Sequence, residues 1–142
     1  MSKKFERYLK TTFGNTYLKE CSGLFGIPDF VLYTTESEEL AIISSELKLT
    51  DWTRAVKQAF RYKSFSNIAY VVLPSCRANA AVNNLEFFEK YNIGLAKFNT
   101  DKHMEIVYKP TARKPYSDAL RQKLVKSISG SQKKSKDVSL LV

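Results

Sequence analysis

The sequence predicts an α/β fold in which helices flank a central mixed β-sheet. Three candidate strands lie close together, at 16–21, 27–33 and 40–49, and the second is rich in branched and aromatic residues. Ser22-Gly23 and the polar segment 34–39 separate them. A helical pattern ending at Tyr62 then leads into a continuous apolar run over 67–73, which is typical of a buried strand. The early strands are spaced for a meander, whereas the helix between two strands predicts a crossover.

The remaining patterns predict elements on both sides of this centre. Phe5, Leu9 and Phe13 recur at helical spacing, which indicates a first helix over 3–13. Thr50 suits the N-cap of the central helix, with Asp51 in its first turn. Beyond residue 73 we expect a helix over 80–91 anchored by Leu85, Phe87 and Phe88, strands over 93–98 and 104–108, and a last helix over 117–128.

The length of 142 residues suits one compact domain. We expect residues 1–128 to form it and residues 129–142 to be a basic, flexible tail, because Ser, Gly and Lys dominate its first part. No apolar run approaches the roughly 20 residues of a membrane helix, and no secretory signal opens the chain. We therefore predict a cytoplasmic protein in which Cys21 and Cys76 are reduced. His103 stands alone, so zinc is not expected.

Positive charge is the dominant compositional bias. The formal net charge is +9, which favours a polyanionic partner such as DNA. Nine Lys or Arg residues lie between Lys109 and Lys136 against a single acid, Asp118. We assign Arg113 and Lys114 in this segment to nucleic-acid binding, although a solvated basic tail explains the same charge equally well. Membrane binding is a weaker interpretation, because no amphipathic helix pairs this charge with bulky aromatics.

Acidic residues occupy two predicted strands in which apolar residues are usual. Glu46 and Lys48 share one face of their strand because side chains alternate, and Asp29 joins them if its strand is adjacent. Two converging carboxylates repel each other unless a cation neutralises them. Oxygen ligands suit Mg²⁺, to which the Leu47 carbonyl offers a further ligand. Lys48 would orient or help deprotonate a water, or stabilise charge on a phosphate.

Pro28-Asp29 followed by Glu46-Leu47-Lys48 resembles the active-site motif of the PD-(D/E)xK nuclease superfamily. The resemblance covers about residues 6–73 and implies a restriction-endonuclease-like core. It also implies Mg²⁺-dependent hydrolysis of DNA that leaves a 5′-phosphate, with Mn²⁺ able to substitute. Ser44-Ser45 departs from the apolar residues usual before the glutamate, which we interpret as a more exposed strand end.

The helix after this motif extends the resemblance. Gln58-Ala59 with Tyr62 one turn later is similar to a pattern in which the glutamine reaches into the site, so Gln58 is a further catalytic candidate. Arg54 and Arg61 lie on the same side of that helix and are suited to phosphate.

Two N-terminal features resemble archaeal Holliday junction resolvases. Glu6 is similar to an additional acid of these enzymes and would be a further metal ligand, with Arg7 beside it on the nucleic acid. Ser22, in the loop before Asp29, is a second contact. A resolvase acts as a symmetric homodimer because it nicks two strands, so the resemblance also implies a homodimer.

Less specific interpretations accompany each assignment. Glu46 and Lys48 also fit a solvated strand face or a structural ion pair, and Glu6 with Lys10 fits a surface pair. Three functions stay open. The first is a metal-dependent DNA endonuclease, with selectivity for junctions or other branched DNA as one form of it. The second is a non-catalytic nucleic-acid-binding module with a nuclease-like fold in a larger complex. The third is a basic protein that binds other acidic partners.

Overall fold

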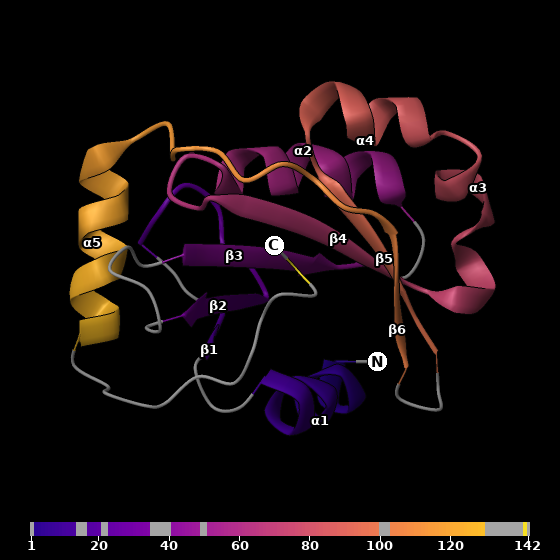
Figure 1. Cartoon of the computed structure of the whole chain (residues 1–142), viewed down its shortest axis with the longest axis horizontal. Coiled ribbons are helices and arrows are strands. Elements are labelled where there is room, and N and C mark those ends of the chain that lie inside the picture. The colour runs from indigo at the N-terminus through magenta and orange to yellow at the C-terminus, as the bar shows by residue number, and fades with distance from the viewer. Residues whose placement is uncertain are drawn as a thin grey trace.

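A six-stranded open sheet forms the centre of the computed structural model, which describes residues 2–13, 17–20, 23–34, 41–48, 51–99, 103–129 and 141. Its strands lie in the order β1-β2-β3-β4-β5-β6 (Figure 1). They are β1 (Tyr17–Lys19), β2 (Phe30–Thr34), β3 (Ala41–Leu47), β4 (Ile68–Pro74), β5 (Gly94–Phe98) and β6 (Met104–Tyr108). The pairs β3–β4 and β4–β5 are parallel and the others antiparallel, so the predicted mixed sheet of an α/β fold is confirmed.

Helices cover both faces of the sheet, with α2 and α4 on one side and α1 on the other (Figure 1). The helix α2 joins the parallel strands β3 and β4, which confirms the predicted crossover. The helical segments are α1 (Ser2–Phe13), α2 (Trp52–Tyr62), the 3₁₀ turn η1 (Ser75–Arg77), α3 (Asn79–Val82), α4 (Leu85–Tyr91) and α5 (Asp118–Ser129). No described helix is both long enough and apolar enough to cross a membrane.

Two apolar layers form the core, one on each face of the sheet. Strand alternation sends Ile42 and Val71 towards α2 and sends Ile43 and Val72 towards α1. The strand β4 is therefore buried on both faces, which explains its uninterrupted apolar run. The α1 layer includes Leu141, within the predicted tail, which is buried; residues 130–140 lie outside the described part of the chain.

The beginning of α2 differs from the prediction. Asp51 is the N-cap itself, because its side chain accepts a hydrogen bond from the Arg54 backbone N–H at 3.2 Å. The expectation that Asp51 lies within the first turn is therefore wrong by one residue. Thr50, the predicted cap, lies outside the described residues.

The predicted helix over 80–91 is two helices, α3 and α4, interrupted at Asn83 and Asn84. The Asn84 side-chain amide donates to the Ala80 carbonyl at 2.7 Å. Asparagine side chains compete for backbone groups in this way, which explains the interruption. Of the predicted anchors, Phe88 is buried, but Phe87 is 43% exposed and was wrongly placed in the core.

Gly94 provides a test of core packing, because a Cβ at this position would overlap atoms of the buried Tyr70 ring. We predict that Gly94→Ala lowers the free energy of unfolding by about 1–3 kcal/mol through overpacking. Urea denaturation measures this loss. It should shrink in a Tyr70→Leu background, and an undiminished loss would contradict the assignment to the ring.

Candidate active site

Asp29 and Glu46 are brought together where β2 pairs with β3. The strands are adjacent, as predicted, and their antiparallel register places Phe30 opposite Ser45. Asp29 precedes β2 by one residue, and its backbone N–H donates to the Ser45 carbonyl at 3.2 Å. Its carboxylate Oδ2 accepts a hydrogen bond from the Leu47 backbone N–H at 2.8 Å. Asp29 is therefore held against the strand that carries Glu46.

The Glu46 side chain points towards α2 and is almost completely buried, with the residue 5% exposed. The Tyr62 hydroxyl donates to Glu46 Oε2 at 2.5 Å, and the Lys48 ammonium lies 3.9 Å from Oε1. This burial excludes the solvated-face interpretation of Glu46, although an ion pair with Lys48 is present. The charges of Asp29, Glu46 and Lys48 thus meet at one end of the β2–β3 pair.

The serines before Glu46 are buried, so their interpretation as an exposed strand end is wrong. The Ser44 hydroxyl pairs with that of Ser66 at 2.5 Å, on the α2 side of the sheet. The Ser45 hydroxyl donates to the Phe30 carbonyl at 3.4 Å on the other side. Buried hydroxyls are tolerated where they find such partners. The hydrogen bonds therefore explain why serines can stand at these two positions, where apolar residues are usual.

Burial raises the pKa values of both carboxyl groups. For Glu46 the pKa rises to about 7, because desolvation and the neighbouring Asp29 outweigh the Tyr62 hydrogen bond and the charge of Lys48. Burial also raises the pKa of Asp29, against the Leu47 hydrogen bond and Lys48. Two negative charges at these positions are therefore unfavourable, and such perturbed pKa values are common at functional sites.

The donor chemistry of this pair suits Mg²⁺. Among the described residues no group of three or more His, Cys, Asp or Glu is placed to hold a metal. Mg²⁺ commonly takes only one or two protein carboxylates and completes its shell with water and substrate phosphate. Asp29 and Glu46 fit that requirement, while the Leu47 carbonyl as a ligand stays a prediction.

Tyr62 and Gly26 position the loop before β2. The Tyr62 hydroxyl lies 3.0 Å from the Ile27 carbonyl as well as contacting Glu46, so it joins this loop to β3. Gly26 has a φ of +84°, and a Cβ there would lie 2.8 Å from the Tyr62 ring. From the sequence, Tyr62 is named only as the end of the helical pattern and for its spacing from Gln58, and Gly26 is not singled out. The spacing of Gly23 and Gly26 was the available signal.

The residues predicted on α2 lie along the helix that carries Tyr62. Gln58 is one turn before Tyr62, and its Oε1 is buried without a hydrogen-bond partner within the described structure. Such an atom costs about 1–3 kcal/mol, so a ligand that donates to it would be favoured. Arg54 and Arg61 are exposed, and Arg61 lies over the Phe25 ring at 5.7 Å. The catalytic assignment of Gln58 stays a prediction.

The N-terminal candidates lie elsewhere. Glu6 is on α1, which packs against the other face of the sheet, and its carboxylate accepts from the Tyr17 hydroxyl at 2.8 Å and from Lys19 at 3.2 Å. These contacts lower the Glu6 pKa. Arg7 is exposed on the same helix. Ser22 lies outside the described residues, and the metal-binding role of Glu6 stays a prediction.

Arg113 and Lys114 are both exposed in the segment that follows β6. The Arg113 backbone N–H donates to the Asn67 carbonyl at 3.0 Å, which fixes this segment beside the start of β4. Both cations are therefore presented by an ordered backbone, on the side of the molecule where β4 begins.

No protein-family model matches this chain, and no match is found among curated proteins or solved structures. The candidate site therefore rests on the residues and their geometry.

The raised pKa of Glu46 predicts how stability depends on pH. Between the ordinary value of 4.5 and about 7, the folded protein keeps a proton at Glu46 that the unfolded chain has lost. This contribution makes stability fall as pH rises through that window. We predict that the free energy of unfolding of Glu46→Gln exceeds that of the wild type by about 1–3 kcal/mol at pH 8 in EDTA. The difference should be smaller at pH 5.

Urea denaturation at both pH values measures this difference. Glu105→Gln is the matched control, because the Glu105 side chain is 70% exposed in its pair with Lys97. An advantage for Glu46→Gln that is equal at both pH values would contradict the assignment.

Proposed function

We propose that this protein is a Mg²⁺-dependent DNA endonuclease with a restriction-endonuclease-like core. The observation that carries the proposal is the meeting of Asp29 and Glu46 across the β2–β3 pair, with Lys48 3.9 Å from Glu46. The order of elements from α1 to β4 supports it, since a helix, a three-stranded meander and a crossover helix precede a parallel strand. The sequence resemblance implies a restriction-endonuclease-like core, and this order of elements is compatible with it.

The three residues have separate roles in this proposal. Asp29 and Glu46 hold the metal, which when bound polarises the phosphodiester and lowers the pKa of a water. The Lys48 side chain is 27% exposed, so its ammonium reaches both Glu46 and the solvent side. It orients the attacking water or stabilises the charge that builds on the phosphate. Gln58 supplies an amide whose carbonyl oxygen is unpaired among the described residues.

Charge supports DNA as the substrate. The chain carries a formal charge of +9, and the five cations proposed to contact nucleic acid are all exposed: Arg7, Arg54, Arg61, Arg113 and Lys114. Cations on the protein surface attract the phosphate backbone without selecting a base sequence. A preference for branched DNA, with the homodimer it would require, is the finer form of this proposal.

A non-catalytic nucleic-acid-binding module is the second candidate. The observation that favours it is that Glu46 is already engaged by the Tyr62 hydroxyl and the Lys48 ammonium. The two candidates differ in one result. Salt-dependent DNA binding that needs no metal, without cleavage in Mg²⁺ or Mn²⁺, supports the module and contradicts the nuclease.

Removal of either carboxylate tests the nuclease directly. We predict that Asp29→Asn and Glu46→Gln each lower the rate of DNA cleavage by at least about 100-fold, because each removes a metal ligand. Plasmid and branched DNA incubated with Mg²⁺ provide the assay, and EDTA should stop cleavage by the wild type. The exposed control Glu105→Gln should cleave normally. Wild-type rates in the Asp29 and Glu46 variants would place the site elsewhere.

Metal binding can be measured without activity. We predict that Mn²⁺ at 100 times its dissociation constant stabilises the wild type by about 2.7 kcal/mol, because it binds only the folded protein. Differential scanning calorimetry with a Mn²⁺ titration measures this as a rise in Tm. Asp29→Asn should lose most of the rise, whereas Glu105→Gln should keep it. An equal rise in Asp29→Asn would show that the metal binds at another place.

A further inference from the structure

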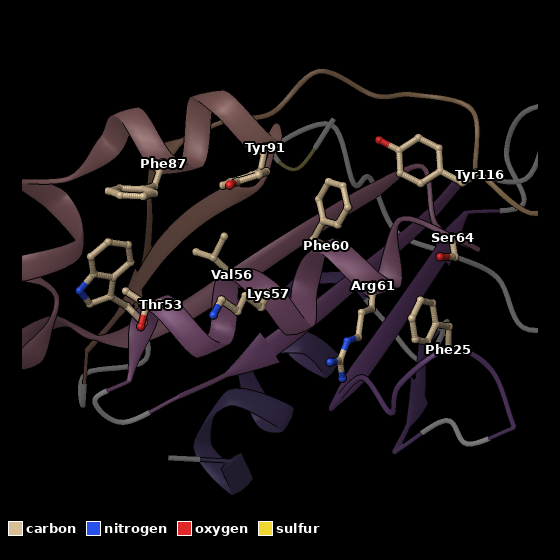
Figure 2. Close-up of a pocket in the computed structure, with 11 residues that line it drawn as sticks. Phe25, Thr53, Val56, Lys57, Phe60, Arg61, Ser64, Phe87, Tyr91 and Tyr116 are labelled. Carbon is tan, nitrogen blue, oxygen red and sulfur yellow. The ribbon is translucent and has the colours of Figure 1, made fainter.

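A groove lined by aromatic rings runs along the outer side of α2 and opens to solvent. Its volume is about 530 Å³. Figure 2 shows Phe60 between Tyr91 and Tyr116, with Phe87 towards one end of the groove and Phe25 beside Arg61 at the other. The aromatic residues that line it are Phe25, Trp52, Phe60, Phe87, Tyr91 and Tyr116.

Five of the six rings are exposed to solvent. Tyr116 is 62% exposed and Phe25 51%, and Phe60, Phe87 and Tyr91 are each more than one-third exposed. An exposed apolar patch of this kind commonly marks a binding surface.

The charge around the groove has a single sign. A second hollow of about 540 Å³ shares Phe60, Tyr91 and Tyr116 with the first, so the two form one surface. Among the described residues that line either hollow, every charged side chain is a cation: Lys57, Arg61, Lys63, Lys90, Arg113 and Lys114. Lys63 is buried and donates to the Tyr91 carbonyl at 3.0 Å, whereas the other five are exposed. The surface is complementary to an anion.

Rings and cations lie next to each other on this surface, as Lys90 does at 5.4 Å from the centre of the Tyr91 ring and Arg61 at 5.7 Å from that of Phe25. Phe60 adjoins Arg61, Tyr91 adjoins Lys90, and Tyr116 follows Lys114 by two residues. Single-stranded nucleic acid repeats a flat base and a phosphate, and proteins bind it with stacking rings and neighbouring cations. An acidic amphipathic helix would instead separate its apolar face from its charges. A duplex keeps its bases stacked inside, so it cannot place them on these rings.

One end of the groove adjoins the candidate active site. Phe25 lies in the loop that leads to Asp29, and Arg61 immediately precedes Tyr62, the residue that donates to Glu46. The guanidinium carbon of Arg61 lies 5.7 Å from the centre of the Phe25 ring. The groove and the candidate active site therefore share the loop before β2 and the last turn of α2.

We propose that this groove binds an unpaired segment of DNA, with bases stacked on the exposed rings and phosphates on the surrounding cations. Binding by the groove stands on its own geometry. Its consequence for substrate choice rests on the proposed nuclease function: the preferred substrate is a duplex that carries a single-stranded segment beside the bond to be cut.

Trp52 provides an internal probe, because it is the single tryptophan and it lines the groove. In EDTA, a thymine oligonucleotide should quench its fluorescence. Fluorescence anisotropy with labelled single strand and duplex then compares affinities. The double variant Phe60→Leu/Tyr116→Leu keeps apolar side chains but loses two flat rings, so single-strand affinity should fall by about tenfold per ring. Duplex affinity should stay nearly unchanged.

The matched control Phe60→Tyr/Tyr116→Phe retains both rings and should bind single strands like the wild type. A second variant, Lys57→Gln/Lys90→Gln, keeps the rings and removes two cations. Its slope of log affinity against log salt for single strands should be smaller by roughly 1.4. Circular dichroism confirms that each variant is folded. Unchanged single-strand affinity in the leucine variant, or equal losses for single strand and duplex, would overturn the proposal.

Sedimentation tests whether a second copy of this chain occupies the groove instead of DNA. If sedimentation shows that the leucine variant dissociates a wild-type dimer while its DNA affinity is unchanged, the groove is a contact between copies and the proposal is overturned. Cleavage in Mg²⁺ is scored separately, on blunt and single-strand-tailed duplexes. If single-stranded DNA binds in a way that depends on the rings but no DNA is cleaved, the proposed role of the groove stands and the nuclease function is contradicted. Equal cleavage of both duplexes by wild type and leucine variant upholds the nuclease and contradicts the proposed substrate preference.

Discussion

The antiparallel pairing of β2 with β3 is the constraint on which the candidate site depends. The Asp29 N–H bonds to the Ser45 carbonyl, and the Asp29 carboxylate bonds to the Leu47 N–H, so backbone and side chain fix the same register. A shift of one residue would turn Glu46 away from α2 and towards the α1 layer. Two carboxylates that repel each other are therefore held together by hydrogen bonds that do not depend on a metal.

The second connection runs through α2. Its buried face packs on the sheet, and from that face Tyr62 reaches Glu46 and the loop carbonyl of Ile27. Gly26 lets this loop pass close to the Tyr62 ring. The outer face of the same helix presents Phe60 and Arg61 to the aromatic groove. One helix thus supports the buried carboxylate on one side and forms the wall of an exposed surface on the other.

Two charged side chains of the described residues, Glu46 and Lys63, are buried, and burial has a different consequence for each. At Glu46 it raises the pKa to about 7, which makes the carboxylate responsive to a cation. At Lys63 a buried ammonium is held by the Tyr91 carbonyl and lies 5.6 Å from the centre of the Phe60 ring and 5.5 Å from that of Tyr116. This lysine therefore shapes the groove from beneath, while the exposed cations around it remain accessible to an anion.

The sequence by itself determined the elements whose signal is local. Side-chain alternation predicted that Glu46 and Lys48 share a face, and apolar periodicity predicted the crossover helix and the buried strand β4, because these patterns depend only on neighbouring residues. Asp29 could be assigned only conditionally, since its place beside Glu46 requires strands that are adjacent in space. The interruption at Asn83 and Asn84 was missed because side-chain competition for the backbone outweighed the apolar pattern.

Only the tertiary structure decided the environment of each polar group. The bond from Tyr62 to Glu46 joins a helix to a strand, and the pairing of Ser44 with Ser66 joins segments 22 residues apart, so neither has a local signature. The aromatic groove arises in the same way, because α2, α4 and the segment before α5 each contribute rings that are unrelated in sequence. Burial is a property of the packed chain, and burial is what distinguishes a charged strand residue from a candidate catalytic carboxylate.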